Sequence, residues 1–226
     1  MFIYDLHVHT SCASGCGHNT VEEMIKRYKE IGFTGFALTN HFYNGNTGVE
    51  RSLSWENFVK EFAKGYYDAL ETAQKLDFDL LFGLEELYRS GKEFLVYGIS
   101  PELLIKTPEL KTGDIKVWSQ FVKENNGFIA YAHPFRKRGY IPDPNTMPDI
   151  SLVDGLEIYN YSNTEEDNTQ AAETFKNSGK IFITGGDLHS VNFDNSFGIK
   201  TTQRIKTTEQ LAAVLKANKF ELYLGK

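Results

Sequence analysis

The chain has 226 residues, of which 41% are hydrophobic and 24% charged, with a formal net charge of −6 at pH 7. This length is sufficient for one α/β barrel with a large core, so we expect a single domain over residues 1–226. The composition is typical of a soluble protein, and no apolar run approaches the ~20 residues of a transmembrane helix. The acidic balance argues against a broad basic face that holds nucleic acid.

The N-terminal segment MFIYDLHVHT alternates like a β-strand and lacks the basic and apolar regions of a signal peptide. We therefore expect a cytoplasmic protein with no membrane partner. The two cysteines, Cys12 and Cys16, are too few for a disulfide framework. Their spacing would suit a metal ion, but two free thiols in a loop are the simpler interpretation.

Strand-like apolar runs alternate with helix-like segments along the whole chain. Strands are expected at residues 2–8, 35–39, 80–87, 94–99, 128–132, 156–159 and 181–186, with a short strand at the C-terminus. Helices are expected at 20–32, 55–76, 115–125, 165–178 and 208–218, the first opened by a capping box of Thr20 and Glu23. This alternation predicts a parallel α/β sheet, either open or closed into a barrel.

The first strand carries Asp5, His7 and His9, which we expect on one face because alternate residues of a strand point the same way. Two imidazoles near a strand end can bind one metal ion. A lone His-x-His pair is equally compatible with incidental histidines on an exposed strand. This motif therefore needs support from the rest of the chain.

Four further motifs place polar side chains at the ends of apolar runs. They are Thr39-Asn40-His41, Gly83-Leu84-Glu85, Ala132-His133-Pro134 and Gly186-Asp187-Leu188-His189. A buried carboxylate such as Glu85 needs a cationic partner, which is either a side chain, Arg89 or Lys92, or a metal ion. Of the six histidines, five lie at predicted strand ends, which chance placement does not explain. Because strand ends converge on one face of a βα barrel, the closed form is favoured.

In this order, the motifs resemble those of the PHP (polymerase and histidinol phosphatase) superfamily. The resemblance runs from residue 5 to residue 189 and rests on five short motifs. It implies an α/β fold, a distorted (β/α)7 barrel that binds two or three divalent metal ions. Mixed imidazole and carboxylate ligands suit zinc, manganese or iron.

The same resemblance implies how the ligands are shared. His7, His9, Glu85 and Asp187 would hold a first ion, Glu85 and His133 a second, and His41 with His189 a third. The third ion needs another ligand from the loop after the first strand, where Ser14 replaces the aspartate of many relatives. We expect His18 to take this role, because three histidines form a familiar zinc site. The alternative is that His18 is an exposed loop histidine.

Two other positions depart from the pattern of the superfamily. The predicted strand at 93–97 contains no histidine, whereas relatives often supply one to the second ion. We therefore expect this ion to be weakly bound, completed by water or absent. Asn40 replaces an aspartate, and an asparagine can still hydrogen-bond a ligand although it brings no negative charge. We expect a tuned site rather than an inactive one.

The chemistry of such a site is hydrolysis by metal-bound hydroxide, which needs no protein nucleophile. The sequence indeed contains no Gly-x-Ser-x-Gly elbow, P-loop or Cys-x-x-Cys zinc ribbon. Arg136 and Arg138 follow His133 and are candidates to bind a phosphate, with Arg89 as a further candidate, because a guanidinium contacts two phosphate oxygens at once. A solvated basic loop is the alternative interpretation of residues 136–138.

The resemblance therefore favours a phosphomonoesterase acting on a small phosphorylated metabolite, similar to histidinol-phosphate phosphatases and nucleotide-directed relatives. Three alternatives stay open: a phosphodiesterase or exonuclease, a protein-tyrosine phosphatase, and a non-catalytic metal-binding regulatory module. The acidic charge argues against nucleic acid as a partner other than as a substrate.

Overall fold

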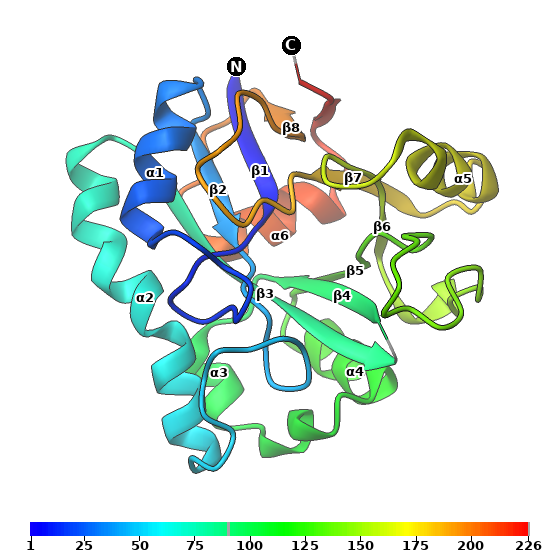
Figure 1. Cartoon of the computed structure of the whole chain (residues 1–226), viewed down its shortest axis with the longest axis horizontal. Coiled ribbons are helices and arrows are strands. Elements are labelled where there is room, and N and C mark those ends of the chain that lie inside the picture. Colours follow the sequence, from blue (N-terminus) through cyan, green and yellow to red (C-terminus); the bar gives the residue numbers. More distant parts are fainter. Residues whose placement is uncertain (90, 226) are drawn as a thin grey trace.

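The centre of the molecule is a mixed β-sheet, seen in a computed structural model that describes residues 1–89 and 91–225 (Figure 1). Over these residues the sheet has nine strands in the order β7-β6-β5-β4-β3-β2-β1-β8-β9. The strands are β1 (Phe2–Val8), β2 (Gly35–Leu38), β3 (Asp79–Arg89), β4 (Lys92–Tyr97), β5 (Phe128–Tyr131), β6 (Gly155–Asn160), β7 (Ile181–Gly185), β8 (Gly198–Thr201) and β9 (Glu221–Tyr223).

The sheet curves until β1 meets the end of β7, so the predicted distorted α/β barrel is confirmed. At this junction the Asp187 N–H donates to the His7 carbonyl at 2.6 Å, and the His9 N–H donates to the Leu188 carbonyl at 2.9 Å. Gly185 allows the close approach, because a Cβ there would lie 2.5 Å from the Cβ of His7. The closure brings the first and last of the sequence motifs together.

The barrel departs from a simple alternation of parallel strands and helices. β3 and β4 form an antiparallel hairpin, which confirms the predicted strands in this region, and β4 is also antiparallel to β5. β8 and β9 extend the sheet beyond β1 in antiparallel pairs. β8 is not among the predicted strands, because its sequence, GIKT, contains one large apolar residue and so no apolar run.

Helices surround the sheet and close one end of the barrel. They are α1 (Val21–Glu30), α2 (Trp55–Lys75), α3 (Pro101–Ile105), α4 (Ile115–Glu124), α5 (Glu165–Phe175) and α6 (Thr208–Lys216), with 3-10 turns η1 (Pro108–Thr112) and η2 (Ile150–Leu152). The capping box of Thr20 and Glu23 is confirmed. In the described part of the chain, none of the helices is both long and apolar enough to cross a bilayer.

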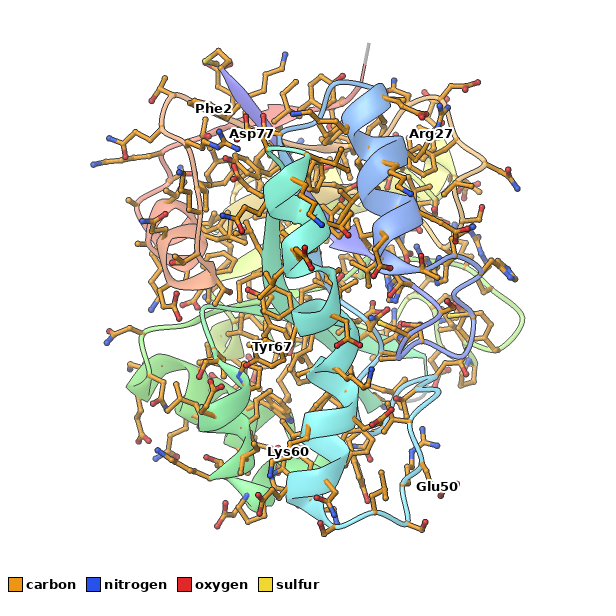
Figure 2. All side chains as sticks on the ribbon, turned by 90° about the vertical axis from the view of Figure 1, so that its left-hand side faces the viewer. Phe2, Arg27, Glu50, Lys60, Tyr67 and Asp77 are labelled. Carbon is orange, nitrogen blue, oxygen red and sulfur yellow. The ribbon has the colours of Figure 1, made fainter. Side chains whose placement is uncertain are left out.

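The outer helices and α6 cover different parts of the sheet. Figure 2 shows α1 and α2 side by side on one flank, with Arg27 on α1 and Lys60 and Tyr67 on α2. α6 instead packs against β3, β4 and β5, and its Leu211 joins a buried apolar cluster with Leu6 of β1. The polar strand ends therefore gather at the end of the barrel opposite α6.

The pairing of β1 with β2 is irregular between Asp5 and Val8, which changes the direction of the side chains. The Nε2 atoms of His7 and His9 lie 3.0 Å apart. Asp5 instead accepts hydrogen bonds from the Tyr28 hydroxyl at 2.7 Å and from the Gly186 N–H at 2.8 Å. The prediction that Asp5 shares a face with both histidines is wrong, because the irregularity interrupts the alternation of the strand.

The close contact at Gly185 gives a test of barrel closure. We expect Gly185→Ala to lower the free energy of unfolding by about 1–3 kcal/mol, because the added methyl group overpacks the β1–β7 junction. Gly139→Ala is the control, since a Cβ at that position meets nothing within 4 Å. It should change stability by less than ~0.5 kcal/mol. Urea unfolding followed by circular dichroism measures both, and equal stabilities would contradict this account.

Candidate metal centre

Glu85 of β3 lies at the centre of a cluster of histidines at the open end of the barrel. Its carboxylate oxygens lie 3.2 Å from His7 Nε2, 3.3 Å from His9 Nε2, 2.9 Å from His41 Nδ1 and 3.0 Å from His133 Nε2. All five residues are buried, with exposed fractions between 0% and 8%. The barrel thus delivers imidazoles from β1 and from the ends of β2 and β5 to one carboxylate.

The segment after β7 adds Asp187 and His189 to this cluster. Asp187 Oδ1 lies 3.2 Å from His9 Nε2 and 3.6 Å from His7 Nε2. The ring of His189 stacks on that of His9, with 4.4 Å between the centroids. Asp187 and His133 have φ angles of 54° and 28°. Non-glycine residues rarely adopt positive φ, and such strain is typical of functional sites.

Hydrogen bonds on the outer side of two histidines fix which ring nitrogen faces the cluster. Nδ1 of His7 lies 3.0 Å from Glu157 Oε1, and Nδ1 of His189 lies 2.9 Å from the Asp187 carbonyl oxygen. Carboxylate and carbonyl oxygens only accept hydrogen bonds, so both Nδ1 atoms carry a proton. In the neutral ring Nε2 is then free to bind a metal ion, as in many metal sites.

His9 also carries its proton on Nδ1, and the hydrogen bonds of Ser14 and Asn40 show this. The Ser14 hydroxyl donates to Asn40 Oδ1 at 2.9 Å and accepts from the His41 N–H at 3.0 Å. Because its proton is used for Asn40, the hydroxyl accepts from Nδ1 of His9, which lies 3.0 Å away. Two positions that depart from the superfamily pattern therefore orient a histidine of the cluster.

Two buried atoms in the cluster have no hydrogen-bond partner among the described residues: Nδ1 of His41 and Oε2 of Glu85. They face each other at 2.9 Å without the geometry of a hydrogen bond. Buried polar atoms without partners are costly, and a cation bound by both would satisfy them. Imidazole nitrogen and carboxylate oxygen are also ligands that divalent transition metals accept. The donors present therefore fit a metal ion.

The possible ligands form several overlapping groups. Four sets of three have all their ligand atoms within 4.8 Å of one another: His9–His41–His189, His7–His9–Glu85, His7–His133–Glu157 and His41–Glu85–Glu93. Because the sets share members, they outline neighbouring positions in one cluster rather than four separate sites. The structure thus brings seven of the predicted ligands together, namely His7, His9, His41, Glu85, His133, Asp187 and His189.

The charges in the cluster depend on one another. Burial favours the neutral form of Glu85, yet His7 and His41 hold its pKa well below the usual range. Burial also opposes the charged form of His7, but Glu157, Asp187 and Glu85 raise its pKa well above the usual value. His7 is therefore protonated at neutral pH without metal. A metal ion has to displace the proton on Nε2, so metal affinity falls as pH is lowered.

Glu157 of β6 is a cluster residue that the sequence prediction misses. It is fully buried and accepts two hydrogen bonds, one from Nδ1–H of His7 and one from the backbone N–H of His133, each at 3.0 Å. Its sequence signal is the same as that of Glu85, a carboxylate within an apolar run, here Gly155–Ile158.

Glu93 of β4 is the second missed carboxylate. Its oxygens lie 3.3 Å from His41 Nδ1 and 3.6 Å from His133 Nε2. Its sequence neighbours give no such signal, because Lys92 precedes it directly. Only the antiparallel pairing of β4 with β3 reveals that Glu93 faces the cluster.

His18 lies outside the cluster. Its side chain is exposed and belongs to none of the ligand sets formed by the described residues. Its backbone N–H donates to the His189 carbonyl at 2.8 Å, and this anchored backbone leaves the side chain in solvent. Of the two interpretations of His18, a metal ligand or an exposed loop histidine, the geometry corresponds to the second. Cys16 is the residue of this loop that reaches the cavity beside the cluster.

A cavity of about 360 Å³ opens beside the cluster. Its lining includes Cys16, His41, Asn46, Glu93, Arg136, Tyr140, Asp187 and His189. Arg136 is buried and forms an ion pair with Asp187, while its Nε donates to Asn163 Oδ1 at 2.7 Å and its Nη2 to Asn160 Oδ1 at 3.1 Å.

The other two candidate arginines are not among the described residues that line this cavity. Arg138 donates to the carbonyls of Lys137 and Ser162, and Arg89 is exposed at the end of β3. Of the three predicted phosphate ligands, the structure therefore places Arg136 beside the cluster.

Comparison with known proteins gives a family and a fold. The model of the PHP domain family matches residues 5–178. No curated protein matches the sequence significantly. One similar solved structure is a two-domain protein from Bacteroides vulgatus containing a predicted PHP-like metal-dependent phosphoesterase, with a TM-score of 0.70 and 14% identity over 99% of this chain and 65% of that one. This chain thus spans less than two thirds of that protein.

Two further solved structures share the fold. An amidohydrolase from Chromobacterium violaceum with bound sulfate has a TM-score of 0.61 and 15% identity, and the match covers 97% of each chain. The lesion-specific endonuclease Q from Pyrococcus furiosus has a TM-score of 0.60 and 12% identity over 99% of this chain and 58% of that one. At these identities the likeness concerns the fold alone.

Because His7 and His9 lie in the cluster and His18 lies outside it, bound metal should depend on the first two and not on the third. At a free Mn²⁺ or Zn²⁺ concentration roughly 100 times Kd, the free energy of unfolding should rise by about 2.7 kcal/mol over that of chelator-treated protein. Replacing both His7 and His9 by alanine should remove most of this gain, because three of the four ligand sets contain one or both of them, whereas His18→Ala should keep it. Thermal unfolding with and without chelator measures the effect. An equal loss in His18→Ala and the double variant would contradict the placement.

Glu86 predicts a pH dependence of stability without metal. Its buried carboxyl group accepts from the Asn44 N–H at 2.9 Å and the Leu87 N–H at 2.7 Å, and burial raises its pKa to about 8. The folded state keeps a proton that the unfolded state loses above its lower pKa, so stability falls as pH rises through this range.

We expect Glu86→Gln, which mimics the protonated form, to gain stability relative to the natural chain between about pH 5 and pH 8, by up to about 5 kcal/mol. Urea unfolding in chelator at the two pH values measures the difference. A stability difference that does not change with pH would show that Glu86 is ionised in the folded protein.

Proposed function

Because the chain belongs to the PHP domain family, we propose that it is a metal-dependent phosphoesterase, and more specifically a phosphomonoesterase that acts on a small metabolite. The observation that carries this proposal is the orientation of His7, His9 and His189 in the cluster of Glu85 and Asp187. Each ring has its Nδ1 proton bound by an acceptor on the outer side and its Nε2 available to a metal ion.

The metal ions that this cluster fits would supply Lewis-acid polarisation of a phosphoryl oxygen and a hydroxide nucleophile near neutral pH. The chain itself contributes orientation. Arg136 is held by Asp187, Asn160 and Asn163 through Nε and Nη2, so Nη1 keeps donors for a phosphate oxygen. A fixed guanidinium can position a phosphate at the cluster without rearranging first.

The size and charge of the cavity favour a small monoester. A volume of about 360 Å³ lies near the lower end of the range for ligand pockets. Tyr140 lies in the cavity wall and is 63% exposed, so its ring is available to the part of a substrate that leaves the cavity. The net charge of −6 opposes long-range attraction of a polyanion.

A phosphodiesterase that acts on nucleic acid is the second candidate function. The fold is shared with endonuclease Q, and a metal cluster that hydrolyses a monoester can also attack a diester. Single-stranded DNA or RNA would be the form of substrate that fits best, because only a flexible strand end can enter a small cavity. The assay of the proposed function therefore includes such strands.

Steady-state hydrolysis of a substrate panel tests the proposed function. The panel contains small phosphomonoesters, single-stranded DNA and RNA, and a phosphotyrosine peptide, each with added Mn²⁺ or Zn²⁺. We expect turnover of phosphomonoesters, and none above background for the variant that lacks both His7 and His9. Metal-loaded protein that hydrolyses no ester would contradict the proposal. Turnover of only the nucleic-acid strands, or of only the peptide, would show that the substrate is a nucleic acid or a phosphoprotein and not a small metabolite.

The two arginine variants show whether Arg136 binds the phosphate. Hydrogen bonds to a charged group contribute about 1.5–3 kcal/mol, so Arg136→Ala should lower kcat/KM by roughly 10- to 100-fold. Arg138 lies outside the cavity, and Arg138→Ala should leave kcat/KM within about twofold. Equal effects of the two substitutions would contradict the assignment of Arg136.

A further inference from the structure

The buried charges of the cluster are strongly unbalanced. Four carboxylates, Glu85, Glu93, Glu157 and Asp187, are each at least nine-tenths buried, and Arg136 is the buried guanidinium that faces them. With neutral histidines this leaves an excess of three negative charges. Buried charge is stable only when it is paired, so the cluster needs cations. One divalent ion is insufficient for this excess.

The ion-pair partners of Glu93 are two histidines. Its oxygens face His41 and His133 at 3.3 Å and 3.6 Å, and no lysine or arginine among the described residues forms an ion pair with it. The neighbouring Lys92 does not pair with Glu93, because its Nζ donates to the carbonyls of Pro134 at 2.6 Å and Pro144 at 2.7 Å. Glu93 therefore has only imidazoles in front of it.

The strand pairing explains how Glu93 reaches the cluster. Leu95 of β4 lies opposite Glu85 of β3, and Glu93 lies opposite Leu87. Side chains two residues apart share a face of a strand, so Glu93 and Leu95 both point into the barrel. β4, which contains no histidine, thus carries the carboxylate of Glu93 on its inner face, two residues nearer the open end of the barrel than Leu95.

An independent observation indicates a ligand at this position. The buried atoms without a hydrogen-bond partner, His41 Nδ1 and Glu85 Oε2, both belong to the set His41–Glu85–Glu93. His41 and Glu85 are 8% and 0% exposed, so water cannot freely compensate them. Two of the three residues in this set therefore present an atom without a hydrogen-bond partner, and the ligand atoms of all three lie within 4.8 Å of one another.

We propose that Glu93 is a metal ligand that recruits an additional divalent cation to the β3–β4 side of the cluster. Carboxylate oxygen is a harder ligand than imidazole nitrogen, so this position accepts Mn²⁺ more readily than the same position would with a histidine. The proposal deepens the proposed metal-dependent function and rests on it for its catalytic meaning. Metal binding alone tests it.

The test uses Mn²⁺ binding to chelator-treated protein. Free Mn²⁺ is measured by electron paramagnetic resonance during titration, and retained metal by elemental analysis after gel filtration. Glu93→Gln should bind one Mn²⁺ fewer per chain, or bind the last one at least about tenfold more weakly. Glu93→His should regain the additional ion with Zn²⁺ but not with Mn²⁺.

Glu86→Gln is the matched control. Glu86 is also fully buried in the β3–β4 hairpin, but its carboxyl group faces the backbone of Asn44 instead of the cluster. Its Mn²⁺ count and affinity should equal those of the natural chain. Circular dichroism of the chelated variants shows that each is folded, and Glu93→His keeps the test possible if Glu93→Gln does not fold.

Two results would overturn the inference. One is a Glu93→Gln variant that binds as many Mn²⁺ ions as the natural chain with the same affinity. The other is an equal loss in Glu86→Gln, which would assign the effect to any buried carboxylate. Failure of the proposed function looks different: the natural chain would bind the expected metal and hydrolyse no ester in the panel.

Discussion

The constraint on which the structure depends is the burial of a carboxylate at Glu85. It has no exposed surface, and its ion-pair partners are histidines delivered by β1, β2 and β5. A charge in this environment is stable only if cations surround it, so the strands have to meet with their ends in register. Barrel closure at Gly185 achieves this by bringing β1 against the end of β7. Fold and site therefore depend on each other, because the cluster is complete only where β1 meets the end of β7.

A second layer of polar groups holds the ligands before any metal binds. Glu157 fixes His7, the Ser14–Asn40 pair fixes His9, and the Asp187 carbonyl fixes His189. Without metal, protons on histidines such as His7 compensate the carboxylates, and a metal ion exchanges with those protons. Oriented ligands lower the cost of assembling a catalytic site, which is the role expected of a preorganised cluster.

Much of this was accessible from the sequence, for identifiable reasons. Long periodic segments predicted the helices and most strands, and polar residues at the ends of apolar runs predicted His41, Glu85 and His133. The positions of Asp5, Glu93 and His18 depend instead on contacts between distant segments, which a local sequence pattern does not contain. Asp5 leaves the expected face through an irregularity in β1, Glu93 enters the cluster through hairpin pairing, and His18 is held outside by a backbone contact with His189. Glu157 lies within an apolar run as Glu85 does, so the sequence contains the same signal for both residues.

The proposed function requires that Glu85 and its histidines form a metal centre. The most direct measurement is anomalous X-ray scattering at the metal absorption edge, from crystals of metal-replete protein. Anomalous peaks are expected about 2.0–2.3 Å from the Glu85 carboxylate and from the ring nitrogens that face it, which are Nε2 of His7, His9 and His133 and Nδ1 of His41. Replete crystals in which the anomalous signal lies elsewhere, with Glu85 and the histidines still in contact with one another, would contradict it.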